Sequence, residues 1–102
     1  MKTRLDELWE LVSNIPAGRV VSYGALGREL SKPTSGRIVG RWMAQSPETI
    51  PWWRVVGKNG DLLTAARDPH LAKLQRELLQ SEGVRLLNGR VDMSEHSFEF
   101  LT

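Results

Sequence analysis

The sequence predicts a small, mainly α-helical protein with one short β-hairpin, arranged as a winged helix-turn-helix. Apolar residues recur with helical spacing in several segments of the 102-residue chain. Two such segments, within about residues 22–46, are short and are joined by a tight turn. An Asn-Gly pair then separates the apolar run at residues 55–56 from Leu62 and Leu63, which predicts a hairpin wing over about residues 54–63.

The first helix is expected over residues 5–12, and Pro16 and Gly18 follow it as helix breakers. Its apolar positions recur at i, i+3, i+4 and i+7 and are Leu5, Leu8, Trp9 and Val12. This spacing is typical of an amphipathic helix that buries one face.

The predicted helix-turn-helix consists of the next two helices. Ser22 is expected to cap a helix that runs to Leu30, and either Thr34 or Ser35 to cap the next, which ends near Ser46. The apolar stripe of the second of these helices is Ile38, Val39, Trp42 and Met43.

A fourth helix follows the predicted wing. Asp68 is its expected N-cap, Pro69 takes the first helical position and Gly83 follows its end. The residues expected to face the core are Leu71, Leu74 and Leu78. Residues 84–102 carry no assigned element, although Phe98, Phe100 and Leu101 are expected to pack back on the rest. No repeat or linker interrupts residues 1–102, which predicts a single domain.

The composition excludes several classes of chemistry. There is no cysteine and there are only two histidines, His70 and His96, so we expect no disulfide, no metal site, no cofactor and no cysteine nucleophile. No apolar run approaches the roughly 20 residues of a membrane span, and the first residues lack the apolar core of a signal peptide. We therefore expect an intracellular protein without a membrane partner.

Positive charge is concentrated in the middle of the chain. Residues 16–67 hold eight basic and three acidic residues, whereas both flanking segments are net acidic. On the predicted helix before Ser46, one face consists of Arg37, Gly40, Arg41 and Ala44. Small residues allow close approach, and arginines contact phosphates and base edges, so this face favours a nucleic-acid surface over an ordinary solvated face.

Three segments resemble, in order and spacing, the DNA-binding domain of the O6-alkylguanine-DNA alkyltransferases. They are GRVVSYGALGREL at 18–30, SGRIVGRWMAQSP at 35–47 and IPWWRVV at 50–56. The family has a Pro-Cys-His-Arg-Val motif whose cysteine accepts the alkyl group. Here Trp52 stands at the cysteine position and Trp53 at the histidine position. A tryptophan in place of the cysteine is typical of alkyltransferase-like proteins, and the chain is identified as a member of that group.

The resemblance implies roles for individual residues. Tyr23 is similar to the tyrosine that crowds a phosphate and rotates the damaged nucleotide outward, and Arg37 to the arginine that fills the vacated base stack. Arg41 is expected to contact the DNA backbone. The expected alkylguanine pocket consists of Pro51, Trp52, Trp53, Arg54 and Arg67. No residue is expected to be catalytic.

The sequence departs from the family pattern at two positions besides Trp52. Ser46 replaces an asparagine whose hydrogen bonds hold the active-site turn, and serine offers fewer such bonds. Trp53 replaces a histidine that alkyltransferase-like members often keep. Glu82 matches the glutamate that ends the family's Cys–His–Glu relay.

The resemblance implies a monomeric, non-enzymatic sensor that binds O6-alkylguanine in double-stranded DNA and marks it for nucleotide excision repair proteins. It would act in the bacterial cytoplasm on the nucleoid, or in the nucleus of a eukaryote. A winged-helix transcriptional regulator without lesion specificity is the alternative, although it predicts more Asn, Gln and Lys on the helix face. A surviving alkyltransferase is the third possibility, but the chain has no alkyl-acceptor cysteine.

Overall fold

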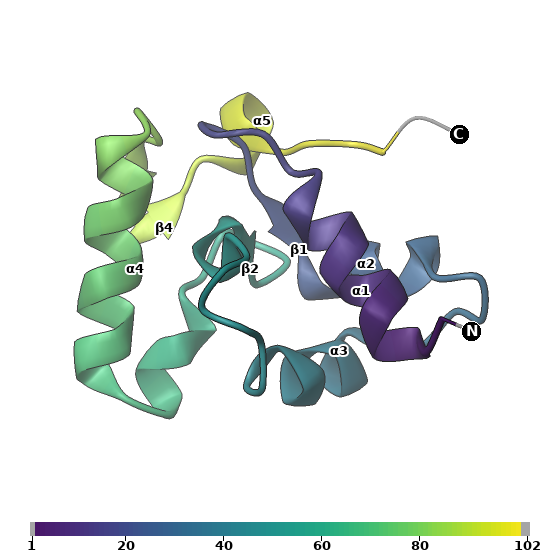
Figure 1. The fold of residues 1–102 in the computed structure, drawn as a ribbon. Helices are drawn as coiled ribbons and strands as arrows, with labels where there is room; N and C mark the ends of the chain where they lie inside the picture. Colours follow the sequence, from purple (N-terminus) through teal and green to yellow (C-terminus); the bar gives the residue numbers. More distant parts are fainter. Residues whose placement is uncertain (1, 101–102) are drawn as a thin grey trace.

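The computed structural model describes residues 2–100 and is mainly helical with two small sheets. Its elements are α1 (Arg4–Ser13), β1 (Val21–Ser22), α2 (Tyr23–Glu29), α3 (Gly36–Met43), the 3₁₀ turn η1 (Trp52–Arg54), β2 (Val55–Val56), the 3₁₀ turn η2 (Leu63–Ala66), α4 (Pro69–Ser81), β3 (Leu86–Leu87), β4 (Arg90–Val91) and α5 (Met93–His96). In Figure 1, α1 and α4 stand on opposite sides of β1 and β2, and α3 runs along the lower edge. This architecture confirms the predicted fold class.

The predicted helix-turn-helix is present, and its helices begin at serine caps. The Ser22 hydroxyl accepts a hydrogen bond from the Ala25 amide at 3.1 Å, and the Ser35 hydroxyl accepts one from the Ile38 amide at 3.3 Å. Ser35 rather than Thr34 is therefore the cap of α3. Each cap satisfies one of the amides that a helix start leaves unpaired.

The helices α2 and α3 meet with almost no side chain between them at Gly36. A β-carbon on Gly36 would lie 2.8 Å from the Gly24 backbone nitrogen, which is closer than real β-carbons come to other atoms. Glycine at this position lets the start of α3 contact α2 directly. This contact fixes the angle at which the Arg37 face of α3 is presented.

The wing predicted over residues 54–63 is wrong as an antiparallel hairpin. β2 pairs instead in parallel with β1, with Val21 opposite Val55 and Ser22 opposite Val56. The chain then turns at residues 57–61, and Leu63 begins η2 rather than a second strand. Val55 and Val56 are 1% and 0% exposed, so β2 is part of the core and not an exposed wing.

The hairpin lies further along the chain, in the tail to which the sequence assigned no element. β3 and β4 pair antiparallel, and Asn88 and Gly89 form the two-residue turn between them. Their φ angles are 54° and 79°, the two positive values that a type I′ turn requires. The chain has Asn-Gly pairs at residues 59–60 and 88–89, and only the second has this geometry: among described residues other than glycine, Asn88 alone has a positive φ.

This C-terminal hairpin supports the loop of residues 57–61. The Val91 amide donates to the Gly60 carbonyl at 2.9 Å, and Arg90 pairs with Asp61 at 2.9 Å. The tail then continues beside β1, where Ser97 bridges Val20 in parallel. Phe98 and Phe100 pack against the core, as predicted, whereas Leu101 lies outside the described residues.

Gly60→Ala should destabilise the protein by about 1–3 kcal/mol more than Gly89→Ala. Both glycines have positive φ, so both substitutions incur left-handed strain of about 1–2 kcal/mol. Only at Gly60 would the new β-carbon lie 2.2 Å from a backbone atom, the Val91 carbonyl oxygen, whereas nothing lies within 4 Å at Gly89. Urea denaturation followed by far-UV circular dichroism measures the difference. Equal midpoints for the two variants would contradict the close approach of the hairpin to the loop.

The ends of α4 are as predicted, but its buried face is not. Asp68 caps the first turn and Pro69 is the first helical residue. At the other end, Gly83 has φ 84° and the Val84 amide donates to the Leu79 carbonyl at 3.0 Å, which is a Schellman motif.

The prediction that Leu71, Leu74 and Leu78 face the core is wrong: Leu74 is 45% exposed and the other two are half-buried. The buried residues of α4 are Ala72, Gln75 and Leu79. Gln75 can be buried because its amide forms hydrogen bonds with other residues of the protein. The apolar residues of α4 alone therefore do not identify its buried face.

The core consists of two clusters on either side of the β1–β2 pair. One joins α1, α2 and α3 through residues that include Leu8, Val12, Leu26 and Val39. The other consists of Val20, Val56, Leu79, Val84 and Val91. Within the described range, none of the helices has the length and apolar character of a membrane span.

Candidate nucleic-acid interface

A cavity of about 820 Å³ opens between the helix-turn-helix and the segment of residues 57–67. We call it the arginine cavity, and its lining residues are Tyr23, Gly24, Gly36, Arg37, Gly40, Gly57, Lys58, Leu63, Thr64, Ala66 and Arg67. Four of its lining residues are glycines, which add no side chain to the walls, and three cations, Arg37, Lys58 and Arg67, surround it. A polyanion that carries a flat apolar group is the ligand that such a surface suits.

Tyr23 stands at the start of α2, directly after the Ser22 cap, and its side chain is half-buried in this cavity. Burial raises the pKa of the Tyr23 phenol above its ordinary value, and the positive charge of Arg67 opposes that rise. The phenol is therefore neutral near pH 7 and can donate a hydrogen bond without repelling a phosphate.

The structure separates the two arginines predicted on α3. Arg37 lies in the first turn and lines the arginine cavity together with Gly40. Arg41, one turn later, is exposed and is not among the lining residues. The arrangement suits Arg37 for contact with a ligand in the cavity and Arg41 for contact beside it.

A second, smaller cavity of about 340 Å³ lies on the other side of Arg67. We call it the tryptophan cavity, and its lining residues are Met43, Ala44, Ser46, Glu48, Trp52, Arg67, Leu71, Leu74 and Leu78. The leucines that do not face the core thus form one wall of this cavity, opposite α3. Arg67 is the residue that both cavities share.

The adjacent tryptophans of the PWW segment belong to different parts of the fold. Trp52 packs against the cluster of α1, α2 and α3 and lines the tryptophan cavity, whereas Trp53 packs against the second core cluster. Their rings meet edge to face, with centroids 5.9 Å apart and planes at 88°. Trp52 therefore lines a cavity, whereas Trp53 packs against the core and lines neither the arginine cavity nor the tryptophan cavity.

Glu82 connects the η1 turn to the end of α4. It accepts hydrogen bonds from Trp53 Nε1 at 3.1 Å and from Arg54 Nε at 3.0 Å and Nη2 at 2.5 Å. Arg54 also donates to the Ile15 carbonyl at 2.8 Å, so its guanidinium has partners on two elements. The side chains of Arg54 and Glu82 are only 15% and 13% exposed. The Glu82 network, which we define as Glu82, Arg54 and Trp53, lines neither cavity.

The pKa of Glu82 reflects this environment. Burial by itself raises the pKa, but the hydrogen bonds from Arg54 and Trp53 and the charge of Arg54 outweigh it and hold the pKa below the ordinary glutamate value. Glu82 is therefore ionised near pH 7. Its partners are all donors, so it holds structure together here and relays no proton.

The turn between α3 and η1 is held by backbone bonds. The Ser46 amide donates to the Met43 carbonyl at 3.1 Å, and the Ile50 amide donates to the Pro47 carbonyl at 3.3 Å. Pro51 is the N-cap of η1, and its carbonyl accepts a hydrogen bond from the Arg54 amide at 3.1 Å. Pro51 supports the position of Trp52 and lines neither cavity.

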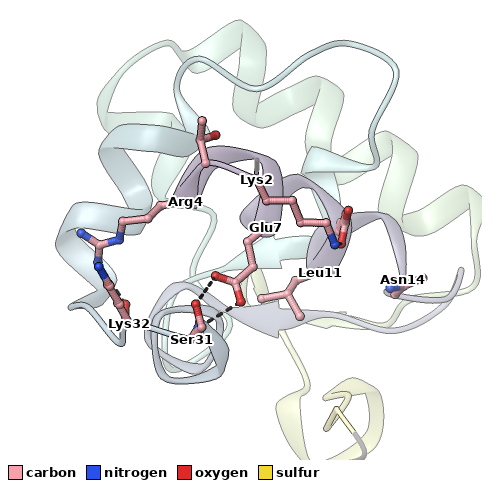
Figure 2. A pocket seen from close by; sticks show the side chains of 9 residues that line it. Lys2, Arg4, Glu7, Leu11, Asn14, Ser31 and Lys32 are labelled. Carbon is pink, nitrogen blue, oxygen red and sulfur yellow. Dashed lines mark hydrogen bonds and ion pairs between the residues drawn. The ribbon is translucent and has the colours of Figure 1, made fainter.

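A third cavity, of about 400 Å³, lies between α1 and the turn after α2 (Figure 2). Several of its polar groups are paired: Glu7 accepts from both the amide and the hydroxyl of Ser31 at 3.0 Å, and Lys2 contacts Glu10 at 2.8 Å. Arg4 donates to the Lys32 carbonyl at 3.0 Å. The bonds of Glu7 and Arg4 fasten the helix-turn-helix to α1.

Of the predicted site residues, the structure brings Tyr23, Arg37 and Arg67 together in one cavity and places Trp52 in the adjoining one. Among the other lining residues, Lys58, Leu63 and Thr64 have side chains larger than alanine and were not predicted from the sequence as site residues. Lys58 directly precedes the Asn59-Gly60 pair that was interpreted as the turn of a wing, and Leu63 and Thr64 follow it. The one signal in the sequence for these residues was the positive charge of Lys58, which lies within the basic segment of residues 16–67.

The comparisons with known proteins agree with this geometry. The family model for the DNA-binding domain of 6-O-methylguanine DNA methyltransferase matches residues 5–84. The chain is 31% identical over 98 residues to the DNA base-flipping protein of Escherichia coli (strain K12), covering 93% of this chain and 74% of that protein. It is 34% identical over 90 residues to alkyltransferase-like protein 1 of Schizosaccharomyces pombe, covering 81% of this chain and 82% of that protein.

The structural comparison agrees as well. The crystal structure of S. pombe Atl1 in complex with damaged DNA containing O6-carboxymethylguanine superposes with a TM-score of 0.83, at 26% identity over 98% of this chain and 100% of that one. These matches define a DNA-binding domain of the methyltransferase type. The chain belongs to the 6-O-methylguanine DNA methyltransferase family and, with tryptophan in place of the acceptor cysteine, to its alkyltransferase-like members.

Proposed function

We propose that the protein is a sensor of O6-alkylguanine in double-stranded DNA, which it binds by rotating the damaged nucleotide out of the helix. The observation that carries this proposal is the meeting of Tyr23, Arg37 and Arg67 around one cavity that adjoins Trp52. One similar protein, from Escherichia coli, is named for DNA base flipping, and another, S. pombe Atl1, was solved with damaged DNA, which supports the same function.

Rotation of a nucleotide out of the duplex costs a few kcal/mol of unstacking and unpairing, and the cost is least for a base that already pairs badly. Arg37 offsets part of this cost by occupying the vacated stack, and Tyr23 presses on the neighbouring phosphate. The extruded guanine occupies the arginine cavity, and its alkyl group reaches past Arg67 toward Trp52. An aromatic surface of this kind stabilises a stacked or packed group by about 1–3 kcal/mol.

The protein is proposed to hold the lesion without repairing it. Alkyl transfer in the family requires a cysteine, and the chain has none. Removal of the bound lesion then falls to other enzymes, and nucleotide excision is the chemistry that removes a base which stays alkylated. We therefore propose nucleotide excision repair proteins as partners, at the nucleoid or in the nucleus.

A duplex with one O6-methylguanine should bind at least about tenfold more tightly than the matched guanine duplex, a difference of 1.4 kcal/mol. Fluorescence anisotropy at several salt concentrations measures both affinities, and both should fall as salt rises because phosphate contacts release counterions. Arg37→Ala should reduce the lesion preference, whereas Arg41→Ala should weaken both complexes equally, because a backbone contact carries no lesion information.

Equal affinities for the two duplexes at every salt concentration would overturn the sensor and favour a winged-helix regulator. A fluorescent base analogue opposite or beside the lesion reports rotation directly. An Arg37→Ala variant that keeps both the signal of rotation and the lesion preference would contradict the role of Arg37, while leaving the sensor itself intact.

A further inference from the structure

The buried face of α4 carries one polar residue, Gln75. Gln75 is fully buried, at 0% exposure, although glutamine is a mostly exposed residue type in proteins. Its amide nitrogen donates to the carbonyl oxygens of Val55 at 3.0 Å and Trp53 at 3.2 Å. Its amide oxygen accepts from the Thr64 hydroxyl at 2.7 Å. Every polar atom of the side chain therefore has a protein partner.

These three bonds join two segments that border the cavities. Thr64 belongs to η2, which with Arg67 forms one wall of the arginine cavity. Val55 and Trp53 belong to the segment that begins with Trp52, in the tryptophan cavity. Gln75 thus spans from the wall that carries Arg67 to the turn that carries Trp52.

An apolar residue of similar size at position 75 would fill the same space without desolvating an amide. A buried hydrogen-bonded group contributes little net stability, but a fully satisfied network in a low-dielectric interior fixes one arrangement of the groups it joins. The three bonds therefore define how η2 sits against η1 and β2. That relation sets the position of Arg67 between the two cavities.

We propose that Gln75, acting through Thr64, is a positioning residue for lesion selectivity. The Gln75–Thr64 bond holds η2 at a fixed place relative to Trp52, so that a base in the arginine cavity and its alkyl group in the tryptophan cavity are contacted together. This inference rests on the proposed function. Gln75 is fully buried and lines neither cavity, so it affects a bound duplex only through the residues that it positions.

The test compares the ratio of the dissociation constants for undamaged and O6-methylguanine duplexes among variants of the whole protein. Gln75→Met should lower this ratio at least fivefold, while affinity for the undamaged duplex changes less than twofold, because Gln75 lines neither cavity. Thr64→Val should also lower the ratio at least fivefold. Thr64→Ser keeps the hydroxyl and should retain the wild-type ratio. Leu79→Ala, on the same buried face of α4, should lower the urea midpoint and leave the ratio unchanged.

The position of η2 is also measurable without DNA. The amides of Arg67 and Asp68 donate to the Thr64 carbonyl at 3.0 and 2.8 Å, so they report on this turn by hydrogen exchange. Thr64→Val should speed their exchange at least fivefold, and Leu79→Ala should speed it less. Wild-type exchange together with a wild-type ratio in Thr64→Val would overturn the inference, as would an equal loss of ratio in Leu79→Ala. If the wild-type protein shows no preference for the lesion, the proposed function is overturned instead. Hydrogen exchange of the Arg67 and Asp68 amides in Thr64→Val then tests by itself whether the Gln75–Thr64 bond positions η2.

Discussion

Glu82→Ala should lower the free energy of unfolding by about 3–5 kcal/mol, because it leaves the guanidinium of Arg54 largely buried without its counter-charge. The Nε–H and Nη2–H groups of Arg54 would lose their carboxylate acceptor, and Trp53 would lose the acceptor of its indole N–H. A domain of this size is stable by about 5–15 kcal/mol, so the variant should be marginal. Urea denaturation followed by far-UV circular dichroism measures the change.

A matched control for Glu82→Ala lies on the same helix. Glu77 is exposed on α4, and Glu77→Ala should stay within about 0.5 kcal/mol of the wild type. A loss below about 1 kcal/mol for Glu82→Ala would place Arg54 and Glu82 among ordinary surface pairs and would contradict the buried network.

The same network predicts a pH dependence of stability. The pKa of Glu82 is lowered in the folded protein, so its contribution is fully present above the unfolded-state pKa and is lost as the pH falls through the folded-state pKa. Glu82→Gln cannot titrate, so its stability should change less than that of the wild type over this acidic range. Urea midpoints between neutral and acidic pH, measured for both proteins, provide the comparison.

Local signals in the sequence were reliable where the chemistry of one or two residues decides the structure. Ser22, Asp68 and Gly83 occupy the helix ends predicted for them, because a cap depends on a side-chain oxygen or a free φ angle at that residue. The same reasoning was ambiguous for the two Asn-Gly pairs. Whether Asn59 or Asn88 forms a type I′ turn depends on whether the flanking segments pair with each other, and β2 pairs with distant β1 instead.

The candidate site shows a similar limit. The cationic residues Arg37 and Arg67 were predicted from a helix face and from resemblance, and they do share a cavity. The sequence did not predict that Trp52 and Trp53 contact different parts of the fold. They differ because consecutive residues of a 3₁₀ turn project to different sides of the chain. Gln75 was missed because the leucines at 71, 74 and 78 are more apolar than the face that is buried. Only the partners of its amide make glutamine acceptable there.

Trp52→Cys alone should leave the protein unable to accept a methyl group from O6-methylguanine DNA. Transfer requires a thiolate whose sulfur bonds to the methyl carbon as the bond from that carbon to guanine O6 breaks, and O6 keeps the electron pair. An unassisted thiol has a pKa of about 8.5, so little thiolate is present at neutral pH. Trp53 cannot take the thiol proton, since an indole N–H only donates, and it already donates to Glu82.

The double variant Trp52→Cys/Trp53→His restores a proton acceptor beside the thiol and should accept the methyl group slowly. Rates should stay low, because Arg54 already donates to both oxygens of Glu82, the group expected to orient the new imidazole. Mass spectrometry of the protein after incubation with methylated DNA detects the gain of one methyl group in place of a hydrogen. The matched control is Trp52→Ala/Trp53→His, which has the imidazole but no thiol and should gain nothing. Efficient methylation of the Trp52→Cys variant would contradict this prediction. It would show that Trp53 does not prevent alkyl transfer and that the absence of a cysteine at position 52 is the whole reason for its loss.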